Sequence, residues 1–287
     1  MDYKTIRGKF WDGRDKDENN DQELITYKFD EDGFKHAILR AFRDLTQRTM
    51  TRKNKNESVS TKSLRDYVCN PDKYTGEDQH SFLKLINDYF DDKYTDYIEW
   101  HKLACKSILT CLAEFYEDKS VSYGKAQKIV NMTMKGIYCL EDADKYIEKF
   151  KPCHMALDSF TLEWFYRCSN SDKYKTKEIE VKRKNLTTWS NLTENQIGDV
   201  FGYYDIQAKI SKLVEKIKEN EQLDITPFEA EFYIWPQMQI TIAAEALYSN
   251  FKDQKELDDF KEKPVKEKYD LLKKLFNSTE CKDPCFI

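Results

Sequence analysis

Apolar residues recur at helical spacing along most of this chain. Between 81 and 117 they stand three or four positions apart, as in the run Phe82, Leu85, Ile86, Tyr89 and Phe90. This period places them on one side of an α-helix and predicts a segment that packs against a core. Because the 287 residues include only 8 Gly and 6 Pro, few positions suit tight turns. Both features favour long helices over a β-sandwich or barrel.

The same period predicts several further helices. Asp30 is a candidate N-cap for a helix that continues to Leu45. Other helices are expected at 125–140, 158–168, 194–219, 227–249 and 254–276, and a break near 91–96 divides the segment 81–117. Short strands are expected near 24–29 and 177–181. The predicted fold is therefore mainly α with minor β structure.

A charged stretch near the N-terminus suggests how the chain is divided. Residues 51–62, TRKNKNESVSTK, carry no apolar anchor, which is typical of a linker. We predict a polar N-terminal extension at 1–62, holding one helix and this linker, and a helical core at 63–287.

The formal net charge of −5 limits how the chain can bind nucleic acid. Proteins held on DNA by their overall charge are usually basic, so a DNA surface here must be a local patch. No run approaches the roughly 18 apolar residues of a membrane-spanning helix. Residues 1–22 also lack the apolar core of an export signal. We therefore expect a cytoplasmic protein without membrane contacts.

The cysteines and histidines form no recognisable metal motif. None of the eight cysteines belongs to a CxxC pair, although Cys281 and Cys285 stand four positions apart. The four histidines are scattered, and no two have the spacing of metal ligands. We expect reduced thiols, no metal site and no cofactor.

The segment 122–140, SYGKAQKIVNMTMKGIYCL, carries a polar stripe. On a helix over 125–140 the apolar residues gather on one side, and Lys128, Asn131 and Lys135 share the other. Such a stripe is either a solvated face or part of a functional surface.

Two further residues flank this helix. Gly124 permits a tight backbone turn before it, and amides at the helix start can hold a phosphate. Asp158, in the segment HMALDSF, precedes another helical run, where the helix dipole stabilises a carboxylate. It is either a simple N-cap or a functional carboxylate that also caps.

Together the two segments resemble the catalytic region of helix-hairpin-helix DNA glycosylases. In that family a glycine-containing hairpin leads into a lysine helix, and an aspartate segment starts the next helix. Here SYGKAQKIVNMTMK resembles the hairpin and lysine helix, and KPCHMALDSF resembles the aspartate segment. The lysine helix is most similar to the archaeal 8-oxoguanine glycosylase branch. Uncharacterised bacterial and prophage proteins carry a similar pair of motifs, and TPFEAEFYIW resembles their C-terminal part.

The resemblance implies a glycosylase-like helical core and a base-excision glycosylase or lyase that acts on DNA. Lys128 would be the amine that forms a Schiff base with the sugar, and Asp158 its carboxylate partner. Lys125, directly after Gly124, is the alternative nucleophile. Because the lysine must react as the neutral amine, we expect burial or the nearby Lys125 and Lys135 to favour loss of its proton.

The same interpretation predicts DNA contacts around the nucleophile and in the basic loop 171–191. Loop lysines and arginines, together with Tyr174 and Trp189, can grip a nucleic-acid backbone. A solvated surface loop is the alternative. The candidate nucleic-acid-binding residues are Gly124, Asn131, Lys135, Lys182, Arg183 and Lys184.

A second hypothesis is a non-catalytic binding protein on a related scaffold. The prophage-type resemblance and the acidic balance suggest a phage or prophage protein that inhibits a bacterial antiphage defence complex, such as Gabija, by covering its DNA-binding surface. Its partner would be that complex, and self-association into a homo-oligomer is expected. Replacing Lys128 would leave its activity unchanged. Aromatic interface anchors would then be Trp11, Tyr89, Tyr94, Tyr97 and Trp100.

Overall fold

The computed structural model describes residues 27–53, 68, 81–246, 253–264 and 267. These residues are helical and contain no β-strand, only two isolated bridges, so the mainly α prediction is confirmed. The strand expected at 177–181 is wrong: the amides of Ile179 and Glu180 both donate to the Thr176 carbonyl, which closes a turn there. Of the strand expected at 24–29, residues 24–26 lie outside the described residues.

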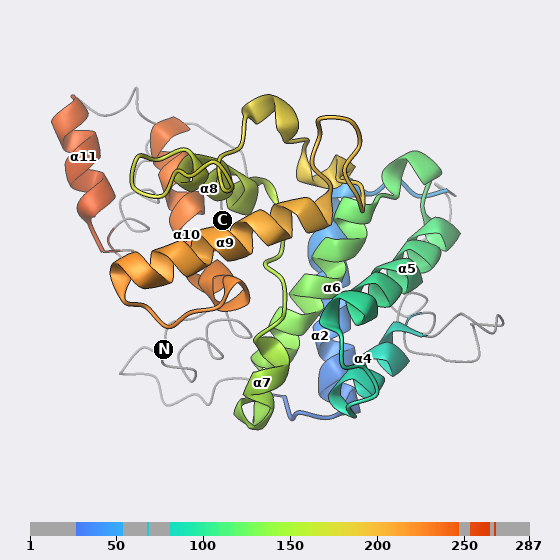
Figure 1. Cartoon of the computed structure of the whole chain (residues 1–287). Helices are drawn as coiled ribbons and strands as arrows, with labels where there is room; N and C mark the ends of the chain where they lie inside the picture. Colours follow the sequence, from blue (N-terminus) through green and yellow to red (C-terminus); the bar gives the residue numbers. More distant parts are fainter. Residues whose placement is uncertain (1–26, 54–67, 69–80, 247–252, 265–266, 268–287) are drawn as a thin grey trace. The chain divides into compact units, whose positions relative to one another are not determined.

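Figure 1 shows the helices and their arrangement. In chain order they are α2 (Glu31–Thr49), α4 (Phe82–Phe90), α5 (Tyr97–Phe115), α6 (Tyr123–Tyr138), α7 (Ile147–Phe150), α8 (Ser159–Ser169), α9 (Tyr203–Glu221), α10 (Pro227–Ala246) and α11 (Gln254–Glu262). Among the described residues, no helix has both the length and the apolar character needed to cross a bilayer.

Side-chain caps set several of the helix starts. Asp30 accepts a hydrogen bond from the Gly33 amide at 2.9 Å, which confirms it as the cap of α2. The break expected near 91–96 is also found, since α4 ends at Phe90 and Asp96 caps α5. The helix predicted from 194 begins only at Tyr203. There Asp205 accepts from the Gly202 amide, and the preceding residues form a loop.

The chain forms two compact units, Met1–Glu231 and Phe232–Ile287. The boundary predicted after residue 62 therefore falls inside the first unit. In that unit α6 packs against α2 and α5, and α4 contacts the same two helices (Figure 1). In the second unit, Pro236 lies inside α10, and Phe260 of α11 is buried.

A chain of polar side chains crosses the core of the first unit. The Tyr204 hydroxyl lies 2.9 Å from His101 Nδ1, and the Tyr203 hydroxyl lies 3.3 Å from His101 Nε2. Tyr203 also lies 3.0 Å from His154 Nδ1 and accepts from Asn131 at 2.8 Å. Because buried polar groups are costly without partners, these bonds determine how α5, α6 and α9 fit together.

Burial keeps the two histidines of this polar network, His101 and His154, neutral. It lowers the pKa of His101 well below its ordinary value, and it lowers the pKa of His154 to about 3. In the unfolded chain both imidazoles take up protons below about pH 6.5. Unfolding is therefore coupled to proton uptake in this range.

We predict that the free energy of unfolding is highest above about pH 6.5 and falls as the pH drops below it. Each buried histidine contributes up to about 1.4 kcal/mol per pH unit. Urea unfolding at pH 7.5, 6.5 and 5.5 measures the slope. His154→Asn should reduce it, whereas His36→Gln, at an exposed position, should not. A free energy independent of pH over this interval would contradict the prediction.

Candidate active site at the lysine helix

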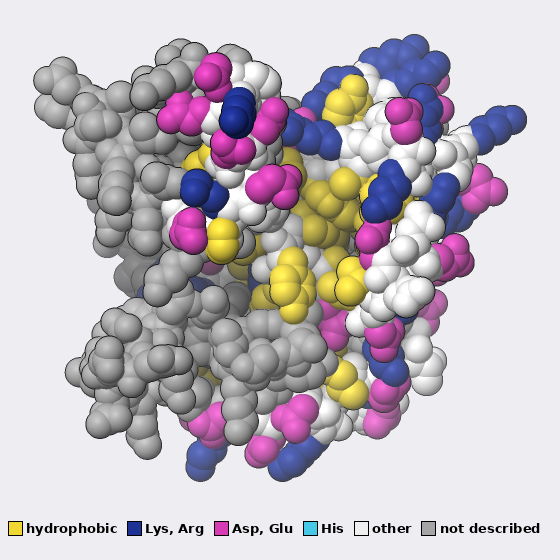
Figure 2. Space-filling model, turned by 90° about the vertical axis from the view of Figure 1, so that its left-hand side faces the viewer, with side chains coloured by type: hydrophobic (Ala, Val, Ile, Leu, Met, Phe, Trp, Pro, Cys, Tyr) yellow, Lys and Arg dark blue, Asp and Glu magenta, His cyan; other side chains and the backbone are white. Residues whose placement is uncertain are grey.

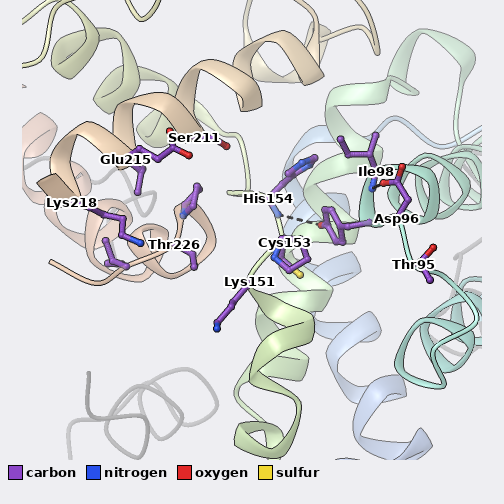
Figure 3. A pocket seen from close by; sticks show the side chains of 15 residues that line it. Thr95, Asp96, Ile98, Lys151, Cys153, His154, Ser211, Glu215, Lys218 and Thr226 are labelled. Atoms are coloured by element: carbon purple, nitrogen blue, oxygen red, sulfur yellow. Dashed lines mark hydrogen bonds between the residues drawn. The ribbon is translucent and has the colours of Figure 1, made fainter.

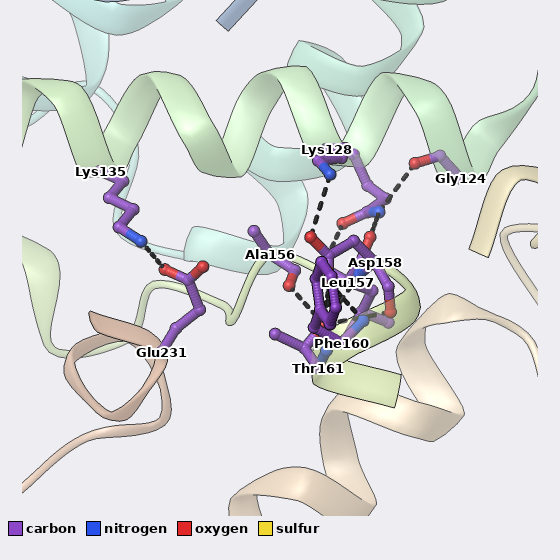
Figure 4. A network of polar contacts seen from close by, with 10 residues as sticks. Gly124, Lys128, Lys135, Ala156, Leu157, Asp158, Phe160, Thr161 and Glu231 are labelled. Atoms are coloured by element: carbon purple, nitrogen blue, oxygen red, sulfur yellow. Dashed lines mark hydrogen bonds and ion pairs between the residues drawn. The ribbon is translucent and has the colours of Figure 1, made fainter. Parts of the chain in front are cut away.

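The polar stripe of α6 faces the inside of the first unit rather than solvent. Asn131 is 1% exposed as a residue, and the side chains of Lys128 and Lys135 are 21% and 11% exposed. Both lysines leave α6 on the side where Asp158 and Glu231 lie (Figure 4). The solvated-face alternative is therefore wrong for this stripe.

Lys128 and Asp158, thirty positions apart in sequence, form an ion pair. Lys128 Nζ donates to Asp158 Oδ2 at 3.1 Å, and the aspartate side chain is 8% exposed. The other carboxylate oxygen, Oδ1, accepts from the amides of Phe160 and Thr161 at 2.9 and 3.0 Å. Asp158 is thus the N-cap of α8 and a partner of Lys128 at once, one oxygen for each role. The two alternatives for this aspartate are compatible.

Trp189 also lies beside the lysine head group. Lys128 Nζ stands 4.9 Å from the centre of the indole ring, within the range of a cation–π contact. Trp189 begins a short 3-10 turn, Trp189–Asn191, that packs on α6. Lys128 therefore contacts both a carboxylate and an aromatic face, which is a suitable setting for an amine that must be oriented.

Gly124 allows this turn to approach α6. A Cβ at Gly124 would stand 1.8 Å from the Trp189 carbonyl oxygen, a distance that no side chain permits. The Gly124 amide donates to the Leu192 carbonyl at 3.1 Å, and the Lys125 amide donates to the Ser122 hydroxyl. The predicted role in phosphate binding does not fit, because the protein itself uses both amides.

Lys125, the alternative nucleophile, has a different environment. Its Nζ donates to the carbonyls of Thr49 and Ser120 at 2.9 and 2.8 Å. Burial lowers the pKa of Lys125 from its ordinary value. These bonds tie α6 to the end of α2, so the structure brings Lys128, and not Lys125, to Asp158.

Lys135 and Glu231 form a second, more deeply buried ion pair on the same side of α6 (Figure 4). Burial raises the pKa of the Glu231 carboxyl, and the nearby charge of Asp158 raises it further, while Lys135 and Lys128 oppose this shift. The four charges thus form one electrostatic cluster. Glu231 is not among the site residues predicted from the sequence. The sequence marks it only as an acidic residue within the aromatic run FEAEFYIW at the start of α10.

Asn131 is also part of the core. Its amide donates to Gln127 Oε1 at 3.0 Å and to the Tyr203 hydroxyl at 2.8 Å. With its amide engaged inside the protein, Asn131 is not placed to contact DNA. The same is true of the Lys135 head group, which Glu231 holds.

The three basic residues predicted in the loop are exposed. Arg183 donates to Glu163 at 2.8 Å and stacks on the Tyr166 ring, 3.7 Å from its centre. Lys182 and Lys184 line a cavity of about 350 Å³ that Glu180 and Asp199 also line. Acidic and basic side chains are likewise interspersed over the face drawn in Figure 2. The loop is therefore of mixed charge rather than a uniformly basic patch.

The aromatic residues predicted as interface anchors are mostly core residues. Tyr89, Tyr97 and Trp100 are at most 5% exposed, and the Trp100 indole donates to the Leu85 carbonyl. Their helical spacing already fits a buried face, which explains the wrong assignment. Trp11 lies outside the described residues.

A larger cavity, of about 540 Å³, opens between α5, α9 and the segment 151–154 (Figure 3). His154 lies at its wall, and the His154 amide donates to the Tyr97 hydroxyl at 3.3 Å. The wall also carries Asp96, Glu215, Lys151 and Lys218, together with apolar side chains such as Ile98 and Val214. Charges of both signs therefore line this cavity, so its lining does not indicate a single class of ligand.

Comparisons with protein-family models, curated proteins and solved structures found no match to this chain. Within the described part of the chain, no three His, Cys, Asp or Glu side chains are grouped so that they could hold a metal ion. Function must therefore be inferred from the geometry around Lys128.

We predict that Gly124→Ala destabilises the protein by about 1–3 kcal/mol, because the 189–192 backbone must move away from the new methyl group. Chemical denaturation measures the change. Gly198→Asn is the control: Gly198 has φ of 57°, which asparagine tolerates, and open space around its Cα. That variant should stay within about 0.5 kcal/mol of the wild type. Equal effects of the two substitutions would contradict this account of Gly124.

We also predict that Lys135→Met destabilises the protein by about 3–5 kcal/mol, because it leaves Glu231 buried without its cation. The double variant Lys135→Met, Glu231→Leu should recover most of this loss, since neither charge then remains. Thermal and urea unfolding of the two variants provide the comparison. A double variant no more stable than Lys135→Met would show that the pair is not the source of the effect.

Proposed function

We propose that this protein is a DNA base-excision glycosylase or lyase in which Lys128 is the nucleophile and Asp158 its carboxylate partner. The observation that supports it most is the 3.1 Å contact between Lys128 Nζ on α6 and Asp158 Oδ2 at the start of α8. The resemblance of the two sequence segments to helix-hairpin-helix glycosylases names these same residues.

The ion pair supplies both a nucleophile and an acid. Transfer of one proton from the Lys128 ammonium to the Asp158 carboxylate gives a neutral amine and a carboxylic acid. The amine nitrogen then bonds to C1′ of the deoxyribose while the bond from C1′ to the base breaks. The electron pair of that bond leaves with the base, which takes the proton from Asp158.

Opening of the sugar completes the step. The bond between C1′ and the ring oxygen breaks, and that oxygen takes a proton from the lysine nitrogen. A protonated Schiff base between Lys128 and C1′ remains. Trp189, next to the Lys128 head group, offers an aromatic face to a base or sugar that enters the site.

We predict that borohydride traps the chain on a duplex with a single abasic site, because lyase chemistry there needs no recognition of a base. Lys128→Arg keeps a cation opposite Asp158 but cannot form a Schiff base, so the adduct should be lost. Lys119→Met, which changes a lysine whose side chain is 78% exposed, should trap like the wild type. Asp158→Asn should slow trapping by about 10²–10⁴-fold, as expected for loss of a proton-transfer group.

The abasic duplex also makes a negative result decisive. If the folded wild type forms no adduct on it, the Schiff-base proposal is wrong, whatever the altered base. If an adduct forms, duplexes with 8-oxoguanine and other altered bases then identify which base the protein removes.

One observation favours the alternative, a protein that binds and inhibits an antiphage defence complex. A DNA-bound enzyme is expected to have a basic face, yet many exposed lysines and arginines here pair with acids. Examples are Arg183 with Glu163 and Lys212 with Glu178. This candidate predicts that Lys128→Arg keeps full inhibitory activity against such a complex, and loss of inhibition in that variant would exclude it.

A further inference from the structure

Gln127, the residue before Lys128, uses every hydrogen-bonding position of its side-chain amide inside the protein. It is fully buried. Its Nε2 donates to the Gly124 carbonyl at 2.7 Å and to the Leu157 carbonyl at 2.9 Å. Its Oε1 accepts from the Leu157 amide at 3.3 Å and from Asn131 Nδ2 at 3.0 Å. Two donors and two acceptors are the full capacity of this group.

Two of these four bonds go to the same residue. Gln127 binds both the N–H and the C=O of Leu157, so one side chain holds one backbone unit from both ends. Hydrogen bonds of this kind are directional and weaken steeply when bent. The paired contact therefore fixes the orientation of the segment before α8 on α6, as well as its distance from α6.

This contact lies directly next to both residues of the ion pair in the sequence. Gln127 directly precedes Lys128, and Leu157 directly precedes Asp158. Neighbouring Cα atoms are about 3.8 Å apart, so fixing Gln127 against Leu157 fixes the backbones of the ion pair within one residue. The lysine side chain does not by itself fix the distance between the two backbones, because its four-carbon stem has many rotamers.

The other bonds that hold this segment are of a different kind. Gln207 on α9 donates to the Met155 carbonyl at 2.7 Å, and Thr161 donates to the Ala156 carbonyl at 2.9 Å. Neither comes from α6, so neither determines the distance from Lys128 to Asp158. Asn131 comes from α6, but it lies 3.5 Å from the Met155 carbonyl and mainly supports Gln127 and Tyr203.

We propose that Gln127 is the positioning residue that sets the geometry of the Lys128–Asp158 pair through its two bonds to Leu157. It does not touch the reacting atoms. Its importance for catalysis rests on the function proposed above, whereas its effect on the ion pair does not.

The test is a double-mutant cycle between Lys128 and Asp158, using Lys128→Met and Asp158→Asn in urea unfolding. The cycle is measured in the wild type, in Gln127→Met and in Gln207→Met. Gln207 is the matched control, because it is also a buried glutamine that binds a carbonyl of the same segment. Should Gln127→Met fail to fold, Gln127→Glu takes its place, since it keeps the acceptor oxygen but cannot donate to Leu157 when ionised.

We expect the coupling between Lys128 and Asp158 to fall by more than half in the Gln127 background and to stay unchanged in the Gln207 background, although both variants lose stability. Unchanged coupling in the Gln127 background would overturn the proposal. Equal losses in the two backgrounds would also overturn it, because a general loosening of the core would then be the cause.

Borohydride trapping of the same variants on the abasic duplex separates this proposal from the proposed function. We expect the trapping rate to fall at least tenfold in Gln127→Met and less than twofold in Gln207→Met. If the wild type does not trap, the proposed function fails while the cycle still decides the role of Gln127. A Gln127→Met protein that traps at the wild-type rate would contradict its role in positioning.

Discussion

The structure of the first unit depends on polar contacts that α6 makes on its inward side. A helix that buries lysine, glutamine and asparagine side chains is stable only if each finds a partner. Lys128 binds Asp158, Lys135 binds Glu231, and Asn131 binds Tyr203, so α6 holds the starts of α8, α10 and α9. These contacts join residues that are 30 to 96 positions apart in sequence.

This arrangement has a cost that hydrophobic packing would avoid. Replacing buried ion pairs by apolar side chains is often neutral or stabilising, so such pairs are weak support for a purely structural role. Two of them on one helix, with an aromatic ring over the less buried lysine, fit the function that we propose. Lys128 is the more exposed of the two lysines, and in the proposed function it is the one that a substrate would reach.

Part of the fold and of the site could be predicted from local sequence patterns. The helical period located the helices, and cap residues such as Asp30 gave their starts, because these signals act within a few residues. The pairing of Lys128 with Asp158 came from a resemblance of two motifs, not from the period. Periodicity alone favoured a solvated stripe, since it cannot show that a polar face is buried by partners from elsewhere in the chain.

The missed features all depend on such distant contacts. Nothing near Lys135 in sequence indicates Glu231, and nothing near Gln127 indicates the backbone of Leu157. The sequence around Gly124 predicts a turn residue, whereas in the structure its small size serves the approach of Trp189. Each of these contacts is fixed by tertiary packing, which a single sequence does not display.

The central claim, that Lys128 and Lys135 on α6 are held by carboxylates inside the protein, is tested most directly by NMR of the side-chain ammonium groups in ¹⁵N-lysine-labelled protein. Lys128 and Lys135 should give separate, slowly exchanging signals, unlike exposed lysines such as Lys119. Asp158→Asn should remove the signal of Lys128 and leave that of Lys135. Signals of Lys128 and Lys135 that exchange as fast as those of exposed lysines would contradict the account.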